Sequence, residues 1–344
     1  SNFTRLALGQ GHAVIVLDLL TYAGHESTLD DVKAHPLFTF VKGDVADREK
    51  VRGLLAEHRP NAIAHFAAET HVDRSIDDPA VFLRTNVMGS FELMEAARHE
   101  KRLPADFRFL LVSTDEVYGA LGPTGAFQED SPYAPNSPYS ASKASADLLA
   151  RAYHETFNFP VIITNCSNNY GPFQFPEKLI PLVLLNALEA KDLPIYGDGG
   201  QIRDWLYVED HCEAILQVLQ KGKAGRKYLI GGRAEKTNLQ LLDVLLAILE
   251  ELRPAALNPA MKAKGIARYQ DLKKFVADRP GHDRRYAIDP SRTEAEIGWK
   301  PRYTFEAGLR TAVEWYLANR DWCERVQKNN YHRDRLGLAE GGEK

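Results

Sequence analysis

Tyr139 and Lys143 are two residues whose types and spacing suggest chemistry. They enclose the segment Tyr139-Ser140-Ala141-Ser142-Lys143, and residues four apart lie on one face of a helix. An ammonium group near a phenol favours the phenolate, so we expect Lys143 to lower the pKa of Tyr139 and make it usable as a base. A surface Tyr–Lys pair without function is the alternative, because so short a pattern also occurs by chance.

Two adjacent carboxylates, Asp115 and Glu116, follow the hydroxyl of Thr114 in the segment STDEVYG at 113–119. The apolar run just before them predicts a buried strand, so they stand at its carboxyl end. Neighbouring carboxylates can divide acid and base work when their surroundings separate their pKa values. The alternative is a solvated turn.

Acidic residues also end or follow other predicted strands. Asp18 ends the apolar run 14–18, and Asp44 follows the next run. In a dinucleotide-binding fold, an acidic residue at such a strand end bonds the adenosine ribose, and its charge disfavours the extra phosphate of NADP. We therefore predict NAD as the cofactor, with turn capping as the alternative role for Asp18.

The elements that must position these residues alternate in type along the first half of the chain. Nearly continuous apolar runs predict strands, and amphipathic stretches between them predict helices at 47–58, 79–100 and 139–157; the strands are expected at 14–18, 38–41, 62–66, 107–113 and 161–164. This alternation is typical of an α/β fold with a doubly wound parallel sheet, Rossmann-like.

The pattern changes after residue 172. Helices are predicted at 176–190, 207–221 and 239–252, joined by segments that contain Gly and Pro. We expect an NAD-binding domain at 1–172, a smaller and mainly substrate-binding lobe at 173–330 with some segments returning to the first domain, and a tail at 331–344.

A glycine-rich turn after a first strand normally approaches the cofactor pyrophosphate. The segment before Val14 instead reads as a helix that has already begun. We expect the first strand and its glycines to precede Ser1, and the sequence to be incomplete at this end.

Composition excludes several classes of protein. The 344 residues are 44% hydrophobic and 26% charged, with a formal charge of −4, which does not favour nucleic-acid binding. The three cysteines have no disulfide or zinc spacing, so a reducing cytoplasm is expected. No apolar run approaches the roughly 20 residues that span a membrane, and no signal peptide is recognised. His71 and His282 lack a metal-binding spacing, and no metal is predicted.

Several motifs taken in order resemble the extended short-chain dehydrogenase/reductase family, from residue 1 to about 320. They are Asp18, AAETHVDRS at 67–75, STDEVYG at 113–119, YSASK at 139–143, NNYGPFQFPEKLIP at 168–181, RDWLYVEDH at 203–211 and DRPGHDRRYAID at 278–289. Within that family the chain resembles the nucleotide-sugar 4,6-dehydratases, with dTDP-glucose as the expected substrate. The Asp115-Glu116 pair distinguishes it from related epimerases.

The resemblance implies a lyase that works by internal redox elimination in deoxysugar biosynthesis of the rhamnose type. Tyr139, assisted by Lys143, would take the proton of the sugar 4-hydroxyl while carbon 4 passes hydride to NAD, and Thr114 would bond that hydroxyl. Glu116 would remove the proton at carbon 5, and Asp115 would protonate the departing 6-hydroxyl. Asp115 must then be protonated while Glu116 is not.

The same matching implies the binding residues. The NAD site would be lined by Asp18, Thr21, Asp44, Val45, Ala67, Ala68, Thr85, Tyr139, Lys143 and Asn169. The nucleotide diphosphate sugar would be held by Thr70, Asn168, Lys178, Leu179, Tyr196, Arg203, Asn238, Arg279 and His282. Arginine and lysine suit a diphosphate, although surface salt bridges are the alternative for Arg203 and Arg279.

The resemblance also implies a homodimer, in which the helices at 79–100 and 139–157 pair with their copies; ordinary packing onto the sheet is the alternative. Two other functions stay open at this stage. One is a dehydratase or epimerase for another nucleotide sugar, and the other is an NAD-bound binding protein without turnover.

Overall fold

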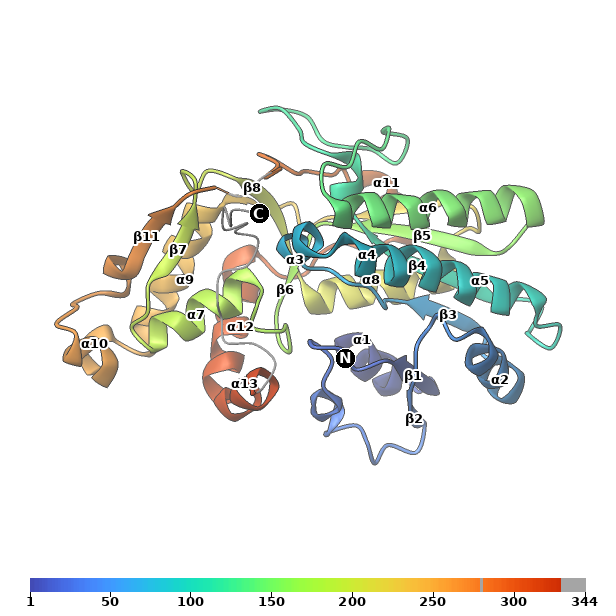
Figure 1. Cartoon of the computed structure of the whole chain (residues 1–344), viewed down its shortest axis with the longest axis horizontal. Coiled ribbons are helices and arrows are strands. Elements are labelled where there is room, and N and C mark those ends of the chain that lie inside the picture. Colours follow the sequence, from blue (N-terminus) through green and yellow to red (C-terminus); the bar gives the residue numbers. More distant parts are fainter. Residues whose placement is uncertain (279–280, 329–344) are drawn as a thin grey trace, which may run out of the picture.

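Residues 1–278 and 281–328 are described by the structure, which is a computed structural model. Parallel strands and their covering helices occupy one side of the molecule, and a second group of elements lies on the other (Figure 1). The first group includes β1 (Val14–Asp18), β2 (Phe38–Lys42), β3 (Ala62–His65), β4 (Arg108–Thr114) and β5 (Val161–Cys166), close to the predicted strands.

These strands form two hydrogen-bonded parallel sheets. One pairs β1 with β2, and the other has the order β3-β4-β5-β9, where β9 is Lys227–Ile230. The predicted parallel α/β fold is thus confirmed. Within the described residues no ladder joins β1 to β3. The strand expected before Ser1 stays a prediction.

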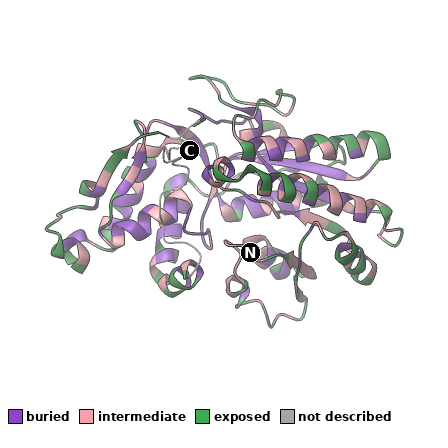
Figure 2. Ribbon diagram, in the orientation of Figure 1, coloured by how far each residue is buried: buried purple, intermediate pink, exposed green. Residues whose placement is uncertain are grey.

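The central strands are apolar along their whole length because both of their faces are covered. Phe109 and Leu111 of β4 pack in a cluster with α2 (Arg48–His58), α5 (Ser90–His99) and α6 (Pro138–Phe157). Leu110, which points to the opposite face, packs in a cluster with residues of α8 (Val208–Lys221). Figure 2 shows β4 and β5 buried, whereas β1 is only partly buried.

The predicted helix at 79–100 is a composite. It consists of α4 (Pro79–Phe82), a π-helical segment η2 (Leu83–Gly89) and α5. A π-helical stretch re-aims the side chains that follow it and occurs often at functional sites. The other helices of this part of the chain are α1 (Asn2–Gly9), η1 (Glu26–Leu29) and α3 (Val72–Asp77).

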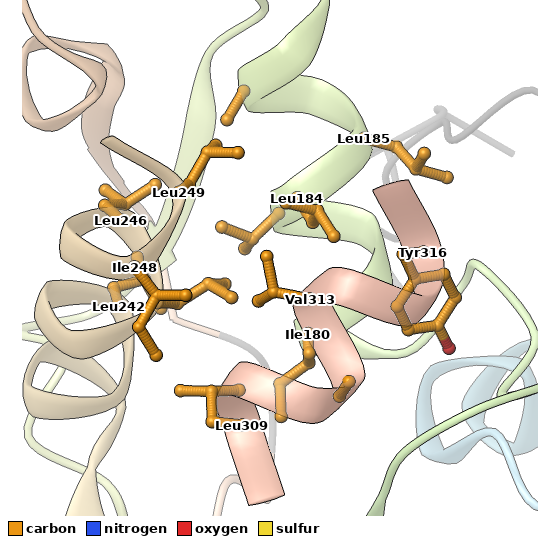
Figure 3. Close-up of a cluster of buried hydrophobic side chains, with 14 of the residues drawn as sticks. Ile180, Leu184, Leu185, Leu242, Leu246, Ile248, Leu249, Leu309, Val313 and Tyr316 are labelled. Carbon is orange, nitrogen blue, oxygen red and sulfur yellow. The ribbon is translucent and has the colours of Figure 1, made fainter. Parts of the chain in front are cut away.

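The second group of elements has its own apolar core. Figure 3 shows its leucine, isoleucine and valine side chains meeting between α7 (Leu179–Leu188), α9 (Asn238–Leu252) and α12 (Phe305–Ala318). Its strands are β6 (Asn168–Tyr170), β7 (Leu193–Tyr196), β8 (Ile202–Tyr207), β10 (Glu235–Thr237) and β11 (Lys273–Val276). Its remaining helices are η4 (Ala255–Leu257), α10 (Pro259–Ala263), η5 (Tyr269–Leu272) and α13 (Arg320–Gln327).

The chain crosses between the two groups more than once. After β8 it forms α8 and then β9, which extends the parallel sheet beside β5, and α11 (Ser291–Ile297) contacts β9. The predicted division at residue 172 stays a prediction, and all of the predicted tail at 331–344 lies outside the described residues.

Candidate active site

The end of β4 places the two carboxylates. The strand continues directly into a 3-10 turn, η3 (Asp115–Tyr118), whose start is capped because the Thr114 hydroxyl accepts from the backbone N–H of Glu116 at 3.3 Å. Gly119 ends the turn with φ of 81°, and a Cβ there would lie 2.2 Å from the carbonyl oxygen of Ala134. The turn that presents Asp115 and Glu116 therefore needs glycine at 119.

The first turns of α6 place the phenol and the ammonium. Ser137 and Ser140 form a reciprocal capping box, and Pro138 occupies the first turn, so the helix begins immediately before Tyr139. Lys143 follows one turn later and donates from Nζ to the carbonyl oxygen of Val112 in β4, at 2.8 Å. Both side chains thus face the end of the strand that carries Thr114.

Asp115 is buried in surroundings that favour its protonated form. Its side chain is 1% exposed. Burial, followed by the charges of Glu116 and Asp204, raises the pKa of Asp115 well above its usual value. Its Oδ2 atom is buried without a hydrogen-bond partner among the described residues. A raised pKa and a carboxyl oxygen without a partner among the described residues suit a general acid.

The expectation for Tyr139 is wrong in this structure. Its pKa is raised well above the usual value, first by burial and then by the charge of Glu116, while a hydrogen bond with Thr114 opposes the change. Burial and Glu116 outweigh any lowering by Lys143, whose Nζ donates to the Val112 carbonyl and whose own pKa is lowered by burial. The structure does bring Tyr139 together with Thr114, Asp115 and Glu116, since each of these three residues influences the pKa of the Tyr139 phenol.

The residues expected at the NAD site lie after the carboxyl ends of several strands. Asp18 ends β1 and its Oδ1 accepts from the N–H of Leu20 at 2.7 Å, so it also caps a turn, as the alternative proposed. Leu20 has a left-handed backbone, with φ of 55°. The others are exposed Thr21 and Asp44, buried Val45, partly buried Ala67 and Ala68 after β3, Thr85 in η2 and Asn169 in β6.

A free polar atom on this edge supports a ligand there. The Oδ1 atom of Asn169 is buried and has no hydrogen-bond partner among the described residues. Its Nδ2 donates to the carbonyl oxygen of Ser167 at 3.0 Å, which fixes the amide orientation. An unpaired buried acceptor is costly unless a ligand donates to it. The residues on this edge therefore fit a dinucleotide.

The residues expected at the nucleotide sugar come from several elements. Lys178 immediately precedes α7 and donates from Nζ to the carbonyl oxygen of Thr70 at 2.9 Å. The rings of Tyr196 and His282 meet edge-to-face at 6.2 Å, and His282 also pairs with Asp278. The remaining described residues of this set are Asn168 in β6, Leu179 at the start of α7, and Asn238 at the start of α9. Arg279 lies outside the described residues.

Arg203 is buried, so the surface salt bridge considered for it is wrong. Its guanidinium stacks 4.2 Å over the ring of Tyr286 and donates to the carbonyl oxygens of Ile202 and Asp283. Its charge also opposes the increase in the pKa of Asp115. Arg203 thus connects the second group of elements to the carboxylates of the first.

Three neighbours of the site were not singled out from the sequence. Asp204 and Tyr286 approach the carboxylates from the second group of elements. Asn86 of η2 is buried; it exchanges hydrogen bonds with the backbone of Glu69 and donates to the Ser142 hydroxyl at 2.8 Å. Asp204 and Tyr286 lie within two of the long motifs, and the only signal for Asn86 is a polar residue inside a helix.

Among the residues that the structure describes, no group of three or more His, Cys, Asp or Glu side chains could hold a metal ion. In the same part of the chain, no helix has the length and apolar character needed to cross a membrane.

Sequence comparisons place the chain beside one group of proteins. The family described as GDP-mannose 4,6 dehydratase matches residues 1–312. The dTDP-glucose 4,6-dehydratase of Xanthomonas campestris pv. campestris (strain B100) is 52% identical over 343 residues, covering 98% of this chain and 95% of that protein. The dTDP-glucose 4,6-dehydratase 1 of Escherichia coli (strain K12) is 49% identical over 333 residues, covering 93% and 90%.

Solved structures agree with these relatives. A dTDP-glucose 4,6-dehydratase from Streptomyces venezuelae, crystallised with NAD bound, superposes with a TM-score of 0.85 at 44% identity and covers 94% of this chain and 95% of that one. A UDP-glucose 4-epimerase from Thermotoga maritima reaches 0.80 at 24% identity over 92% and 94% of the two chains, a likeness that shows the fold alone.

Proposed function

The chain belongs to the dTDP-glucose 4,6-dehydratases of the extended short-chain dehydrogenase/reductase family, and from that premise we propose that it converts dTDP-glucose to dTDP-4-keto-6-deoxyglucose and water, as an NAD-dependent hydro-lyase of deoxysugar biosynthesis. The observation that carries the proposal is the buried carboxyl of Asp115 beside Glu116 and Tyr139, in surroundings that raise its pKa well above the usual value. Loss of water from a sugar needs a proton donor for the leaving hydroxyl, and Asp115 supplies one.

The first step uses Tyr139, Lys143 and Thr114. Tyr139, as its phenolate, accepts the proton of the sugar 4-hydroxyl, Thr114 bonds the same hydroxyl, and the Lys143 ammonium stabilises the phenolate before the transfer. Burial and the charge of Glu116 raise the pKa of Tyr139, so forming the phenolate has a cost that the Lys143 ammonium offsets. NAD, when bound, supplies the acceptor for that hydride and later returns it to carbon 6.

The elimination uses the two carboxylates. A ketone at carbon 4 acidifies the hydrogen at carbon 5, and Glu116 removes that proton. Asp115 delivers its proton to the 6-hydroxyl, which leaves as water, and a carbon 5–carbon 6 double bond forms. Reduction at carbon 6, with a proton returned to carbon 5, gives the 4-keto-6-deoxy sugar. Glu116 gives that proton back to carbon 5, so Tyr139 ends protonated and Asp115 ionised, and net transfer of one proton from Tyr139 to Asp115 resets the site.

Binding assignments follow the positions already described. For NAD we propose Asp18, Thr21, Asp44, Val45, Ala67, Ala68, Thr85, Tyr139, Lys143 and Asn169. For the nucleotide diphosphate sugar we propose Thr70, Asn168, Lys178, Leu179, Tyr196, Arg203, Asn238, Arg279 and His282. Among the described residues, what supports them is the position of the proposed NAD residues after strand ends, the open acceptor on Asn169, and the positive charges of Lys178 and Arg203, which suit a diphosphate.

A homodimer in the cytoplasm is the proposed working form. Leu83 and Met88 of η2 and Leu148 of α6 are 53%, 48% and 55% exposed, an unusual concentration of large apolar side chains on two neighbouring helical segments. Pairing of these helices with their copies would cover them. The three cysteines form no disulfide, which fits a reducing compartment.

The deciding experiment supplies the protein and NAD with dTDP-glucose, UDP-glucose and GDP-mannose separately, and identifies each product by mass and NMR. We expect a product 18 mass units lighter from dTDP-glucose, carrying a 4-ketone and a 6-methyl group. An unchanged mass with inverted carbon 4 would instead show an epimerase. A product from another nucleotide sugar alone would reassign the substrate, and no product would favour a binding protein.

A further inference from the structure

Asp147 is a buried carboxylate that the proposed mechanism does not use. It lies one helical turn beyond Lys143 on α6, so Tyr139, Lys143 and Asp147 succeed one another on one face of the helix. Its side chain is 1% exposed. A buried carboxylate is expensive unless hydrogen bonds and a nearby positive charge compensate it, so its surroundings indicate what it does.

Two hydrogen bonds hold the Oδ2 atom of Asp147. The Tyr133 hydroxyl donates to it at 2.9 Å, and the Nδ2 of Asn165 donates at 3.0 Å. The same Nδ2 also donates to the backbone carbonyl of Thr114 at 3.0 Å. Asp147 is therefore tied through Asn165 to the residue that caps the catalytic turn.

Lys143 and Asp147 each influence the pKa of the other. Burial lowers the pKa of Lys143, and the negative charge of Asp147 is the largest opposing influence, followed by that of Cys166. Burial raises the pKa of Asp147, while Asn165 and Lys143 oppose that increase.

Other titratable groups face the pair from the elements packed around it. Lys227 of β9 lies over the rings of Tyr118 and Tyr133; burial lowers its pKa, and the charge of Asp147 opposes that decrease. His65 of β3 is buried and its pKa is lowered to about 3, so it stays neutral. Of the two lysines, Lys143 is the one that donates a hydrogen bond to β4, the strand that ends in Thr114.

We propose that Asp147 is a positioning residue that keeps Lys143 charged beside Tyr139 and, through Asn165, fixes the backbone of Thr114. It rests on the proposed role of Lys143 in the first oxidation. Without the Asp147 charge, Lys143 would lose its proton at lower pH, and the phenolate of Tyr139 would lose its stabilising cation.

The first test measures the pKa of Lys143 without turnover. Lysine labelled with ¹³C at Cε is observed by NMR across pH, and the Lys143 signal is assigned as the one lost in Lys143→Arg. We expect Asp147→Asn to titrate at least about one pH unit lower than the parent. Glu155→Gln removes a charge from an exposed position of the same helix and serves as the control that leaves the titration unchanged. An unchanged Lys143 titration in Asp147→Asn overturns the proposal.

The second test measures the rate of carbon 4 oxidation with dTDP-glucose across pH. We expect the fall in rate at high pH to begin about one pH unit earlier in Asp147→Asn than in the parent. In a Lys143→Met background, Asp147→Asn should lose the part of its effect that depends on Lys143, so the two losses should be less than additive, whereas a fully additive loss would show that Asp147 does not act through Lys143 and overturn the proposal.

Tyr133→Phe provides a milder variant if Asp147→Asn does not fold. It removes one of the two hydrogen bonds to the carboxylate, which weakens the charged form of Asp147, so both measurements should move in the same direction by a smaller amount. Unchanged values would again contradict the proposal. Absence of oxidation in the parent protein would instead count against the proposed function, because the NMR titration does not depend on turnover.

Discussion

The Nζ atom of Lys143 lies 2.8 Å from the backbone carbonyl oxygen of Val112, which bonds the start of α6 directly to the strand that ends in Thr114. Tyr139 and the carboxylates therefore belong to one rigid unit, although 23 residues separate Glu116 from Tyr139 in the chain. A fixed geometry of this kind is what proton transfers at neighbouring sugar carbons require.

Tyr139→Phe should abolish oxidation at carbon 4. The change removes the hydroxyl that accepts the proton and keeps the ring, so the expected loss is at least about a hundredfold. The measurement is the transient absorbance of reduced NAD after mixing with dTDP-glucose. Tyr153→Phe, a change on the same helix at a hydroxyl that bonds Glu95, is the control and should behave as the parent. Normal turnover of Tyr139→Phe would remove it from the mechanism.

Glu116→Gln and Asp115→Asn should separate the two carboxylate roles. Glu116→Gln leaves oxidation possible but should block exchange of the carbon 5 hydrogen with heavy water. Asp115→Asn should permit that exchange and slow water loss by about 10²–10⁴-fold, because only the acid is gone. Deuterium uptake is followed by NMR alongside product formation. Exchange in Glu116→Gln at the parent rate would show that Glu116 is not the base.

Asp115→Asn should also stabilise the folded protein at neutral pH. The pKa of Asp115 is raised by burial, so the folded state holds this proton more tightly than the unfolded state, and the parent loses stability as pH rises above about 3.9 toward the folded pKa. Urea unfolding should show that the variant's advantage in the free energy of unfolding over the parent grows from pH 4 to pH 8. The exposed Asp77→Asn should show no such trend. A difference in the free energy of unfolding that does not change with pH would contradict the raised pKa of Asp115.

Asp18 should make the protein prefer NAD to NADP. Its carboxylate stands at the end of β1, where it would repel a 2′-phosphate, although its exposure reduces the effect. Calorimetric titration of both dinucleotides should show weaker binding of NADP. Asp18→Asn should reduce the difference between the affinities for NAD and NADP. Equal affinities of the parent for NAD and NADP would leave Asp18 with only a structural role, as the cap of the turn at Leu20.

Leu148→Glu should weaken the proposed dimer. The substitution places a charge on an exposed apolar position of α6, which would be desolvated if two copies meet there. Sedimentation velocity should show a dimer for the parent and a concentration-dependent shift toward monomer for the variant. Leu257→Glu is a matched change at another exposed leucine and should leave the mass unchanged. A monomeric parent would contradict the proposed assembly.

Local patterns in the sequence were enough to predict the parallel α/β fold and the positions of most central strands and helices. Continuous apolar runs such as β4 arise because opposite-facing side chains, Phe109 and Leu110, are both covered by helices, and that burial is visible in composition alone. The helix that carries Tyr139 and Lys143 was likewise evident, because its spacing and its proline near the start are local features.

The tertiary structure decided how deeply the reacting side chains are buried and which charges lie near them. The pKa of Tyr139 is raised because burial and Glu116 outweigh any help from Lys143, whose ammonium is directed to Val112 instead. Arg203 and Asp204 reach Asp115 from a strand almost ninety residues later in the chain. Burial and long-range charge depend on which distant segments fold against one another, so spacing along the chain could identify the reacting groups but not their protonation.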